Sequence, residues 1–263
     1  MMQQIAASKK PPCCYANKDQ FVQITSLENK TFKHLKQLLE PKGIKKHGEH
    51  LLFGESVTKE FEKAYSDRII ARLVSEKFNT NESSFKSYTL DNELFKTLDI
   101  FGTNSPILWV KSSEVKNWSE SSPISDTELF IATGDPSNLG SLLRSAAAFN
   151  WEKVILLKEC ANPFHPKATR ASSGLSARMT LFRGPSIHEL NNTKDLIALD
   201  LEGENLYQSQ FKAPIRLLVG EEGPGIPKSL NIKKIHIPMS DKVESLNATV
   251  AASIVMSYLN RNN

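Results

Sequence analysis

Three short polar clusters in the second half of the chain contain residue types that can hold a ligand and act on it. The first carries Asn138 and, six residues later, Arg144; the second carries Glu222 among glycines; the third carries Ser245 and Asn247. A guanidinium can grip a phosphate or a carboxylate, while amide, hydroxyl and carboxylate groups fix orientation through hydrogen bonds. Each has a plainer alternative, because Asn and Ser also cap helices and an arginine can simply lie on the surface. The chemistry therefore depends on whether the fold brings the clusters together.

Short apolar runs surround these clusters and predict the strands that would position them. The runs are Leu129–Ala132, Val154–Leu157, Leu196–Asp200, Ile215–Gly220 and Ile235–Pro238. Nearly continuous apolar strands are typical of a parallel sheet covered on both faces, and helix-compatible stretches lie between them. We therefore predict an α/β fold whose clusters share the carboxyl edge of the sheet, where ligands bind in such folds.

The turn from Gly220 to Gly225 is the strongest local signal for close contact with a ligand. Glycines allow a ligand to approach the backbone, and Pro-Gly favours a tight turn. The spacing partly matches a nucleotide-binding fingerprint, but Pro224 and Pro227 interrupt it and we expect no helix to open from the last glycine. A dinucleotide site is therefore disfavoured, and an ordinary loop remains the alternative.

The segments NLGSLLRSAAAFN, LLVGEEGPGIP and IPMSDKVESLNATVAAS, in this order, resemble the three signature motifs of the SpoU (TrmH) family in the SPOUT superfamily. The resemblance covers Thr127 to Leu259. It implies methylation of a ribose 2′-hydroxyl in RNA with S-adenosylmethionine as cofactor. It also implies a homodimer formed through the C-terminal domain, and a deep trefoil knot, a rare exception to the rule that chains are not knotted.

The resemblance also assigns roles to individual residues. The catalytic set it implies is Asn138, Arg144, Glu222, Ser245 and Asn247. Backbone contacts with the cofactor are implied at Leu199, Gly220, Ile237, Met239 and Leu246. Because arginine stays charged in proteins, we expect Arg144 to grip a phosphate and stabilise negative charge rather than to act as a base. The sulfonium is already an activated leaving group, so no metal is expected. Two departures from the family pattern are Asp241 and Leu175.

The N-terminal half is expected to form a small α/β domain with a basic helix. Apolar residues recur at helical spacing from Thr31 to Leu39, strands are predicted at His50–Ser56, Arg68–Ser75 and Ser105–Lys111, and a helix at Thr58–Tyr65. The lysines of the region are Lys30, Lys33, Lys36, Lys42, Lys45 and Lys46. A charge run alone is usually a solvated helix face. However, this half resembles a substrate-binding domain of SpoU enzymes related to a ribosomal-protein fold, which implies RNA contact and favours ribosomal RNA.

The chain divides by composition into four parts. Residues 1–19 lack apolar periodicity and are expected to form a flexible tail, and residues 117–126 are expected to form a serine-rich linker. The family resemblance makes residues 20–116 the expected RNA-binding domain and residues 127–263 the expected methyltransferase domain. At 263 residues the chain has room for two domains of ordinary size.

Composition sets limits on the class of protein. The net charge of +4 permits a polyanionic partner, and neither a membrane span nor a signal peptide is expected. The three cysteines, Cys13, Cys14 and Cys160, form no disulfide framework or zinc spacing. We expect a cytoplasmic protein. The alternatives are a transfer-RNA 2′-O-methyltransferase, an enzyme that methylates a base, and an RNA-binding SPOUT protein without activity.

Overall fold

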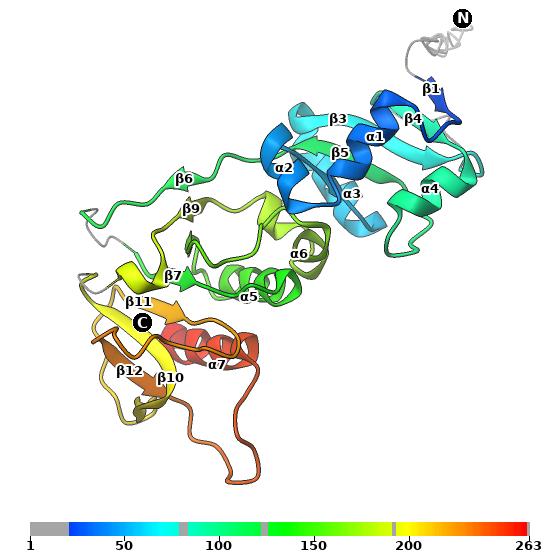
Figure 1. Ribbon diagram of the computed structural model, residues 1–263. Helices are drawn as coiled ribbons and strands as arrows, with labels where there is room; N and C mark the ends of the chain where they lie inside the picture. The colour runs from blue at the N-terminus through cyan, green and yellow to red at the C-terminus, as the bar shows by residue number, and fades with distance from the viewer. Residues whose placement is uncertain (1–20, 79–83, 122–125, 191–192, 262–263) are drawn as a thin grey trace, which may run out of the picture.

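A computed structural model of the chain describes residues 21–78, 84–121, 126–190 and 193–261. Two α/β units lie side by side, the N-terminal one in blue and cyan and the C-terminal one in green to red (Figure 1). The predicted tail, together with Cys13 and Cys14, lies outside the described residues. Within the described part of the chain, no helix is long and apolar enough to cross a membrane.

The N-terminal unit is built on a mixed five-stranded sheet in the order β1-β4-β3-β5-β2. Strands β1, β4 and β3 are parallel, whereas β5 runs antiparallel to both β3 and β2. The strands are β1 (Phe21–Ile24), β2 (Glu49–Leu52), β3 (Ile69–Ser75), β4 (Ser87–Leu90) and β5 (Ile107–Lys111). The helices are α1 (Lys30–Gln37), α2 (Pro41–His47), α3 (Glu55–Ala64) and α4 (Asn92–Leu98), with a 3-10 turn, η2 (Ser66–Arg68).

The basic helix predicted from Thr31 to Leu39 is confirmed as α1. Asn29 caps it by accepting hydrogen bonds from two backbone N–H groups, and Phe32 and Leu35 are fully buried. Helix α2 was not expected. It begins at Pro41, a residue that suits a first helical turn, and ends at Gly48 in the left-handed conformation with φ of 64°.

The predicted strand His50–Ser56 is wrong beyond Leu52. Gly54 has φ of 94°, which breaks the extended chain at little steric cost, and α3 begins at the next residue. The first turn of α3 therefore contains residues that the apolar pattern had assigned to the strand.

The C-terminal unit contains a seven-stranded sheet in the order β12-β10-β11-β7-β8-β9-β6. All of its strand pairings are parallel, which confirms the predicted parallel sheet. The strands are β6 (Lys116–Asn117), β7 (Glu128–Ile131), β8 (Lys153–Leu156), β9 (Leu181–Arg183), β10 (Leu196–Asn205), β11 (Arg216–Val219) and β12 (Lys233–His236). Strands β9 and β6, at one end of the sheet, were not expected. The segment expected to be a linker begins on this sheet, with Asn117 in β6 and Trp118 packed edge-on against Phe130.

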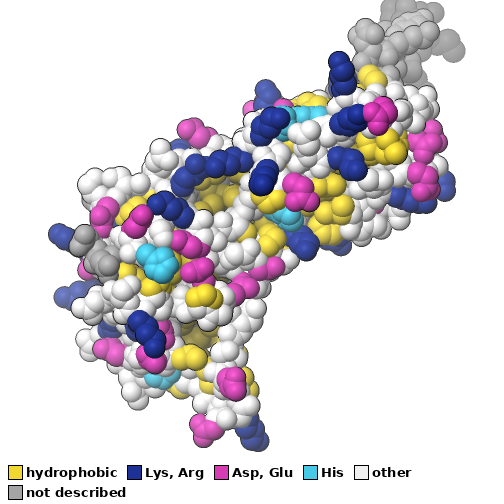
Figure 2. All heavy atoms as spheres, viewed as in Figure 1, with side chains coloured by type: hydrophobic (Ala, Val, Ile, Leu, Met, Phe, Trp, Pro, Cys, Tyr) yellow, Lys and Arg dark blue, Asp and Glu magenta, His cyan; other side chains and the backbone are white. Residues whose placement is uncertain are grey.

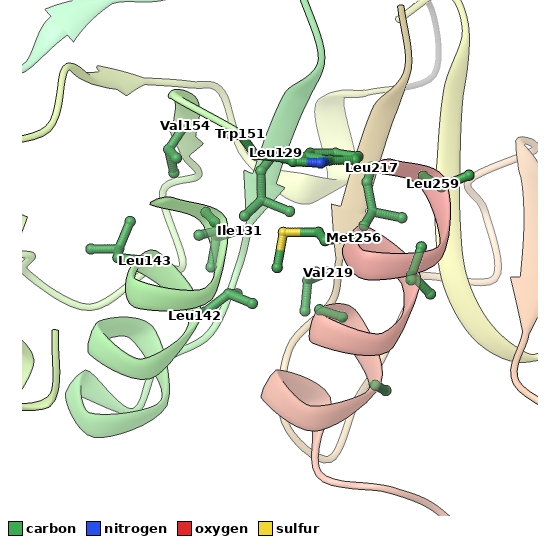
Figure 3. Close-up of a cluster of buried hydrophobic side chains, with 14 of the residues drawn as sticks. Leu129, Ile131, Leu142, Leu143, Trp151, Val154, Leu217, Val219, Met256 and Leu259 are labelled. Carbon is green, nitrogen blue, oxygen red and sulfur yellow. The ribbon is translucent and has the colours of Figure 1, made fainter. Parts of the chain in front are cut away.

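Two long helices, α5 (Pro136–Ala148) and α7 (Ala248–Arg261), cover one face of this sheet. Figure 3 shows Met256 of α7 between the two helices, beside Ile131 and Val219 of the central strands. The remaining helical pieces are α6 (Pro166–Ala171), η3 (Leu175–Ala177) and η4 (Ile187–Glu189). Because burying one large aliphatic side chain contributes about 1.5–3 kcal/mol, this cluster is the main support for both helices.

The two units meet through a small apolar cluster and an arginine. Ala177 of η3 packs among Leu52, Phe61 and other residues of the N-terminal unit. Arg68 donates to the carbonyl oxygens of Ala177 at 2.8 Å and of Lys111 at 2.9 Å. Charge-assisted bonds of this kind are stronger than neutral ones, so this contact holds the units in a defined arrangement.

Candidate functional site

A cavity of about 570 Å³ opens at the carboxyl ends of β10, β11 and β12. Its size is within the range of cofactor sites. All five residues predicted to contact the cofactor line it, together with four of the five predicted catalytic residues. They are Leu199, Gly220, Ile237, Met239 and Leu246, with Asn138, Glu222, Ser245 and Asn247. The structure thus brings together residues separated by more than a hundred positions in the sequence.

Asn138 and Glu222 are in direct contact. The amide Nδ2 of Asn138 donates to Glu222 Oε1 at 2.9 Å, and the buried hydroxyl of Thr133 donates to the same oxygen. The alternative that Asn138 caps α5 is wrong, because Asp135 is the cap and accepts from the backbone N–H of Asn138 at 2.7 Å. The side chain of Asn138 is therefore free to face the cavity.

Asn247 combines structural and site roles. Its Oδ1 accepts from the backbone N–H of Thr249 at 2.9 Å, which confirms that it caps α7. Its Nδ2 donates to Asn138 Oδ1 at 3.4 Å. Ser245 precedes it on an exposed loop that projects from the body of the unit between β12 and α7 (Figure 1). A chain of side chains therefore runs from Asn247 through Asn138 to Glu222.

The glycine turn closes on itself beside the cavity. Glu221 and Gly225 exchange two backbone hydrogen bonds, and Gly225 is left-handed with φ of 68°. A Cβ atom on Gly220 would lie 2.7 Å from the carbonyl oxygen of Gly225, so the closed turn requires glycine there. This geometry leaves the backbone at Gly220 open to the cavity.

Arg144 is the one predicted catalytic residue that does not line the cavity. It lies six residues after Asn138 on α5, about 9 Å along the axis. Its side chain is exposed and forms no ion pair or hydrogen bond with any residue that the structure describes. The guanidinium is therefore available to a partner outside the chain.

Sequence reasoning missed two polar groups of the site. Thr133 follows β7 and supports Glu222. Asp200, which lines the cavity, forms an ion pair with Lys234 of β12 at 2.7 Å. The position of Asp200 directly after Leu199 at the end of an apolar run was the available signal, whereas Lys234 gave none.

The six predicted RNA-binding lysines are all exposed and lie on or beside α1 and α2. Figure 2 shows Lys and Arg side chains gathered over the N-terminal unit on the face in view. Lys33 forms an ion pair with Glu28. The other five have no ion pair with any described residue. Uncompensated cations on one surface attract a polyanion.

The parallel sheet and the cavity at its carboxyl edge place the C-terminal unit among the α/β proteins that bind a nucleotide-like ligand there. Residues 129–257 match the model of the SpoU rRNA Methylase family, and through them the chain belongs to that family. The resemblance noted in the three motifs is thereby confirmed. No group of three or more His, Cys, Asp or Glu side chains placed to hold a metal ion occurs among the described residues.

Two curated relatives extend beyond the family region. The ribosomal RNA small subunit methyltransferase G 2 of Syntrophobacter fumaroxidans is 36% identical over 242 residues, which are 90% of this chain and 48% of that protein. The chain thus spans about half the length of that relative. An uncharacterized tRNA/rRNA methyltransferase of Synechocystis is 27% identical and is matched over 89% of this chain and 91% of its own length.

Solved structures share the whole architecture. An AdoMet-bound rRNA methyltransferase from Sinorhizobium meliloti has a TM-score of 0.76 at 19% identity and covers 92% of this chain and 98% of its own. The SpoU methyltransferase AviRb from Streptomyces viridochromogenes, in complex with AdoMet, has a TM-score of 0.74 at 21% identity. The match covers 89% of this chain and 98% of AviRb. An RNA 2′-O ribose methyltransferase has a TM-score of 0.72 at 22% identity, and the match covers 92% of this chain and 100% of that one. At these identities the likeness establishes the fold.

Proposed function

We propose that this protein transfers a methyl group from S-adenosylmethionine to a ribose 2′-hydroxyl of RNA, with ribosomal RNA as its target. The observation that carries the proposal is the single cavity lined by nine of the ten predicted cofactor and catalytic residues. A structural neighbour named as an RNA 2′-O ribose methyltransferase supports the choice of reaction.

The cavity fits the cofactor in size and in the character of its walls. Leu199, Ile237 and Leu246 offer apolar contact, and Gly220 offers open backbone. S-adenosylmethionine, when bound, supplies a methyl group on a sulfonium that is already a good leaving group. Two of the structural neighbours were solved with AdoMet bound, which supports this choice of cofactor.

The chain's own residues would orient the RNA and handle its charge. Glu222, held by Thr133 and Asn138, presents a carboxylate at the cavity wall, and Ser245 and Asn247 add hydroxyl and amide groups. The exposed guanidinium of Arg144 would hold a phosphate of the RNA near the reacting ribose and stabilise negative charge on its oxygen.

Assembly and topology are part of the proposal. On α7, Val250, Ile254 and Tyr258 are spaced by four residues and keep solvent exposure, and Val250 is 48% exposed. Such a stripe suits the homodimer that the family resemblance implies. The trefoil knot implied by the same resemblance, and a cytoplasmic location, are proposed with it.

Ribosomal RNA is favoured because the N-terminal unit carries the exposed lysines, which would contact RNA phosphates. The Synechocystis relative is named as a tRNA/rRNA methyltransferase, which keeps transfer RNA open as a second target. An RNA-binding protein without activity is disfavoured by the intact contacts among Asn138, Glu222 and Asn247.

The test is transfer of labelled methyl from S-adenosylmethionine to unmodified ribosomal RNA and transfer RNA, followed by alkaline digestion. Label in alkali-resistant dinucleotides of ribosomal RNA, lost in Arg144→Ala, is the expected result. Label in a base would overturn the ribose assignment, and label only in transfer RNA would overturn the target. No label in any RNA would remove the proposed activity.

A further inference from the structure

One ion pair on the cavity wall has free hydrogen-bonding capacity that the proposed reaction does not use. Asp200 of β10 and Lys234 of β12 are joined Oδ2 to Nζ at 2.7 Å, and both line the cavity. Their side chains are only 17% and 22% exposed, respectively. In register, Lys234 lies opposite Ala198, two residues before Asp200, so both side chains occupy the same face of the sheet.

The carboxylate of Asp200 is charged and only partly satisfied within the chain. Burial raises the pKa of Asp200, but hydrogen bonds from Lys234 and from the backbone N–H of Glu202 outweigh burial and hold the pKa below its usual range. A carboxylate offers about four lone-pair sites. Lys234 and the backbone N–H groups of Glu202 and Leu201 contact this carboxylate, which leaves a lone-pair site open, and the ammonium of Lys234 retains two further protons.

A carboxylate and an ammonium held side by side match the hydrogen-bonding needs of a vicinal diol. Each hydroxyl of such a diol donates one hydrogen bond and accepts others, so one can donate to Asp200 while its neighbour accepts from Lys234. An acidic residue that binds ribose hydroxyls is a recurrent solution in nucleotide sites of α/β proteins. The internal ion pair stays intact in this arrangement.

We propose that Asp200 and Lys234 form the ribose subsite of the cavity, in which they bind the 2′- and 3′-hydroxyls of the adenosine part of the cofactor. The inference rests on the proposed function, because it takes an adenosine cofactor as the occupant. It assigns to Asp200 the larger share of recognition, since the carboxylate accepts a hydrogen bond from either hydroxyl.

The competing explanation is a cross-strand ion pair that only joins β10 to β12. The chain contains a matched control for it. Lys233 and Glu204 join the same two strands at 3.0 Å, and neither lines the cavity. Surface pairs of this kind contribute little to stability, so Glu204→Gln removes a contact between the same two strands without touching the subsite.

The experiment is calorimetric binding of two probes, S-adenosylhomocysteine and 5′-deoxy-5′-methylthioadenosine, to the full chain and to the variants Asp200→Asn and Glu204→Gln. The second probe keeps the ribose and adenine but lacks the amino-acid end. We expect Asp200→Asn to weaken the binding of both probes by the same factor, about tenfold or more. Glu204→Gln should weaken the binding of neither probe by more than about twofold. Equal melting temperatures of the two variants would exclude a folding defect.

If Asp200→Asn weakened the binding of S-adenosylhomocysteine but not that of the methylthio nucleoside, the proposal would be overturned, because Asp200 would then contact the amino-acid end. Unchanged binding of both probes in Asp200→Asn, or equal losses in both variants, would also overturn it. A 2′-deoxy form of the methylthio nucleoside should bind the wild type more weakly, and Asp200→Asn should add little further loss. If the wild type binds neither probe, the proposed function itself fails, which is a different result from any of these.

Discussion

The hydroxyl of Thr133 donates a hydrogen bond to Oε1 of Glu222, the same oxygen that accepts from the amide of Asn138. Thr133 is 2% exposed, so the carboxylate is held from the core side by a group that cannot be replaced by water without rearrangement. Glu222 itself lies on the exposed glycine turn. This part-buried contact therefore orients a side chain whose backbone lies on an exposed turn.

Removal of that hydroxyl is expected to slow methyl transfer without weakening cofactor binding. In Thr133→Val the shape is kept and one hydrogen bond to the carboxylate is lost, so we expect kcat to fall about tenfold, equivalent to about 1.4 kcal/mol. Thr133→Ser should restore most of the rate. Thr180→Val, at an exposed threonine, is the matched control. A lower cofactor affinity with unchanged kcat would contradict this role.

The lysines of α2 are expected to contribute electrostatic affinity for RNA. Each phosphate contact adds about 0.7–0.9 to the slope of log K against log salt concentration. Replacing Lys42, Lys45 and Lys46 by Gln should lower that slope by about 2 to 3, measured by filter binding to ribosomal RNA. The control replaces Lys59, Lys63 and Lys96, exposed on α3 and α4. Equal slopes for both triple variants would place the RNA elsewhere.

Glu128 is expected to be essential for stability rather than for activity. It is fully buried at the start of β7 and forms ion pairs with Lys153 and with Arg216, whose Nε lies 2.7 Å from Glu128 Oε2. Glu128→Gln would remove the carboxylate charge from both of these ion pairs, and breaking a buried pair costs about 3–5 kcal/mol. Urea unfolding measures this loss. A change below about 1 kcal/mol, as for a surface pair, would contradict it.

The domain junction is expected to lose stability in acid. His50 is fully buried, stacks on Phe164 at 5.0 Å, and has its pKa lowered to about 3 by burial and by the charge of Arg68. A histidine in the unfolded chain has a pKa near 6.5. The stability that the neutral ring of His50 contributes is therefore fully present above about pH 6.5 and is lost as the pH falls toward 3. The slope approaches about 1.4 kcal/mol per pH unit.

Urea unfolding at pH 7.5 and pH 5.5 tests this dependence. His50→Asn should show a smaller loss between the two pH values than the wild type, because the other titrating groups are common to both. An identical pH dependence in the two proteins would rule out His50 as the source.

The parallel sheet could be predicted from sequence because its central strands are apolar on both faces, as at Leu217 and Leu218. Strands β6 and β9, at one end of the sheet, could not, since Lys116 and Arg183 give them no such pattern. Asn138 could have capped the helix that carries it, but α5 starts at Pro136 because Asp135 is the cap. Cap preferences read from the sequence do not decide which of two suitable residues, three positions apart, caps the helix.

Site residues could be predicted where they belong to a recognisable sequence motif. They could not be predicted where the contact joins residues of strands that are distant in the sequence. Glu222, Ser245 and Asn247 reach the cavity as the resemblance implied. Lys234 does not stand out in the sequence, and its role appears only when β12 is placed beside β10. Arg144 was expected at the same site, yet a helix carries it away from the cavity wall.

Arg68 ties the two units together at their junction. Arg68 donates to carbonyl oxygens of both units, that of Lys111 at the end of β5 and that of Ala177 in η3, so the distance from the lysines of α2 to the cavity is set by the protein and not by its partner. The distance between the lysines and the cavity is therefore fixed before any partner binds. In the function proposed above, an RNA whose phosphates contact these lysines would present to the cavity only the nucleotide at one fixed distance, so distance as well as base identity would select the target.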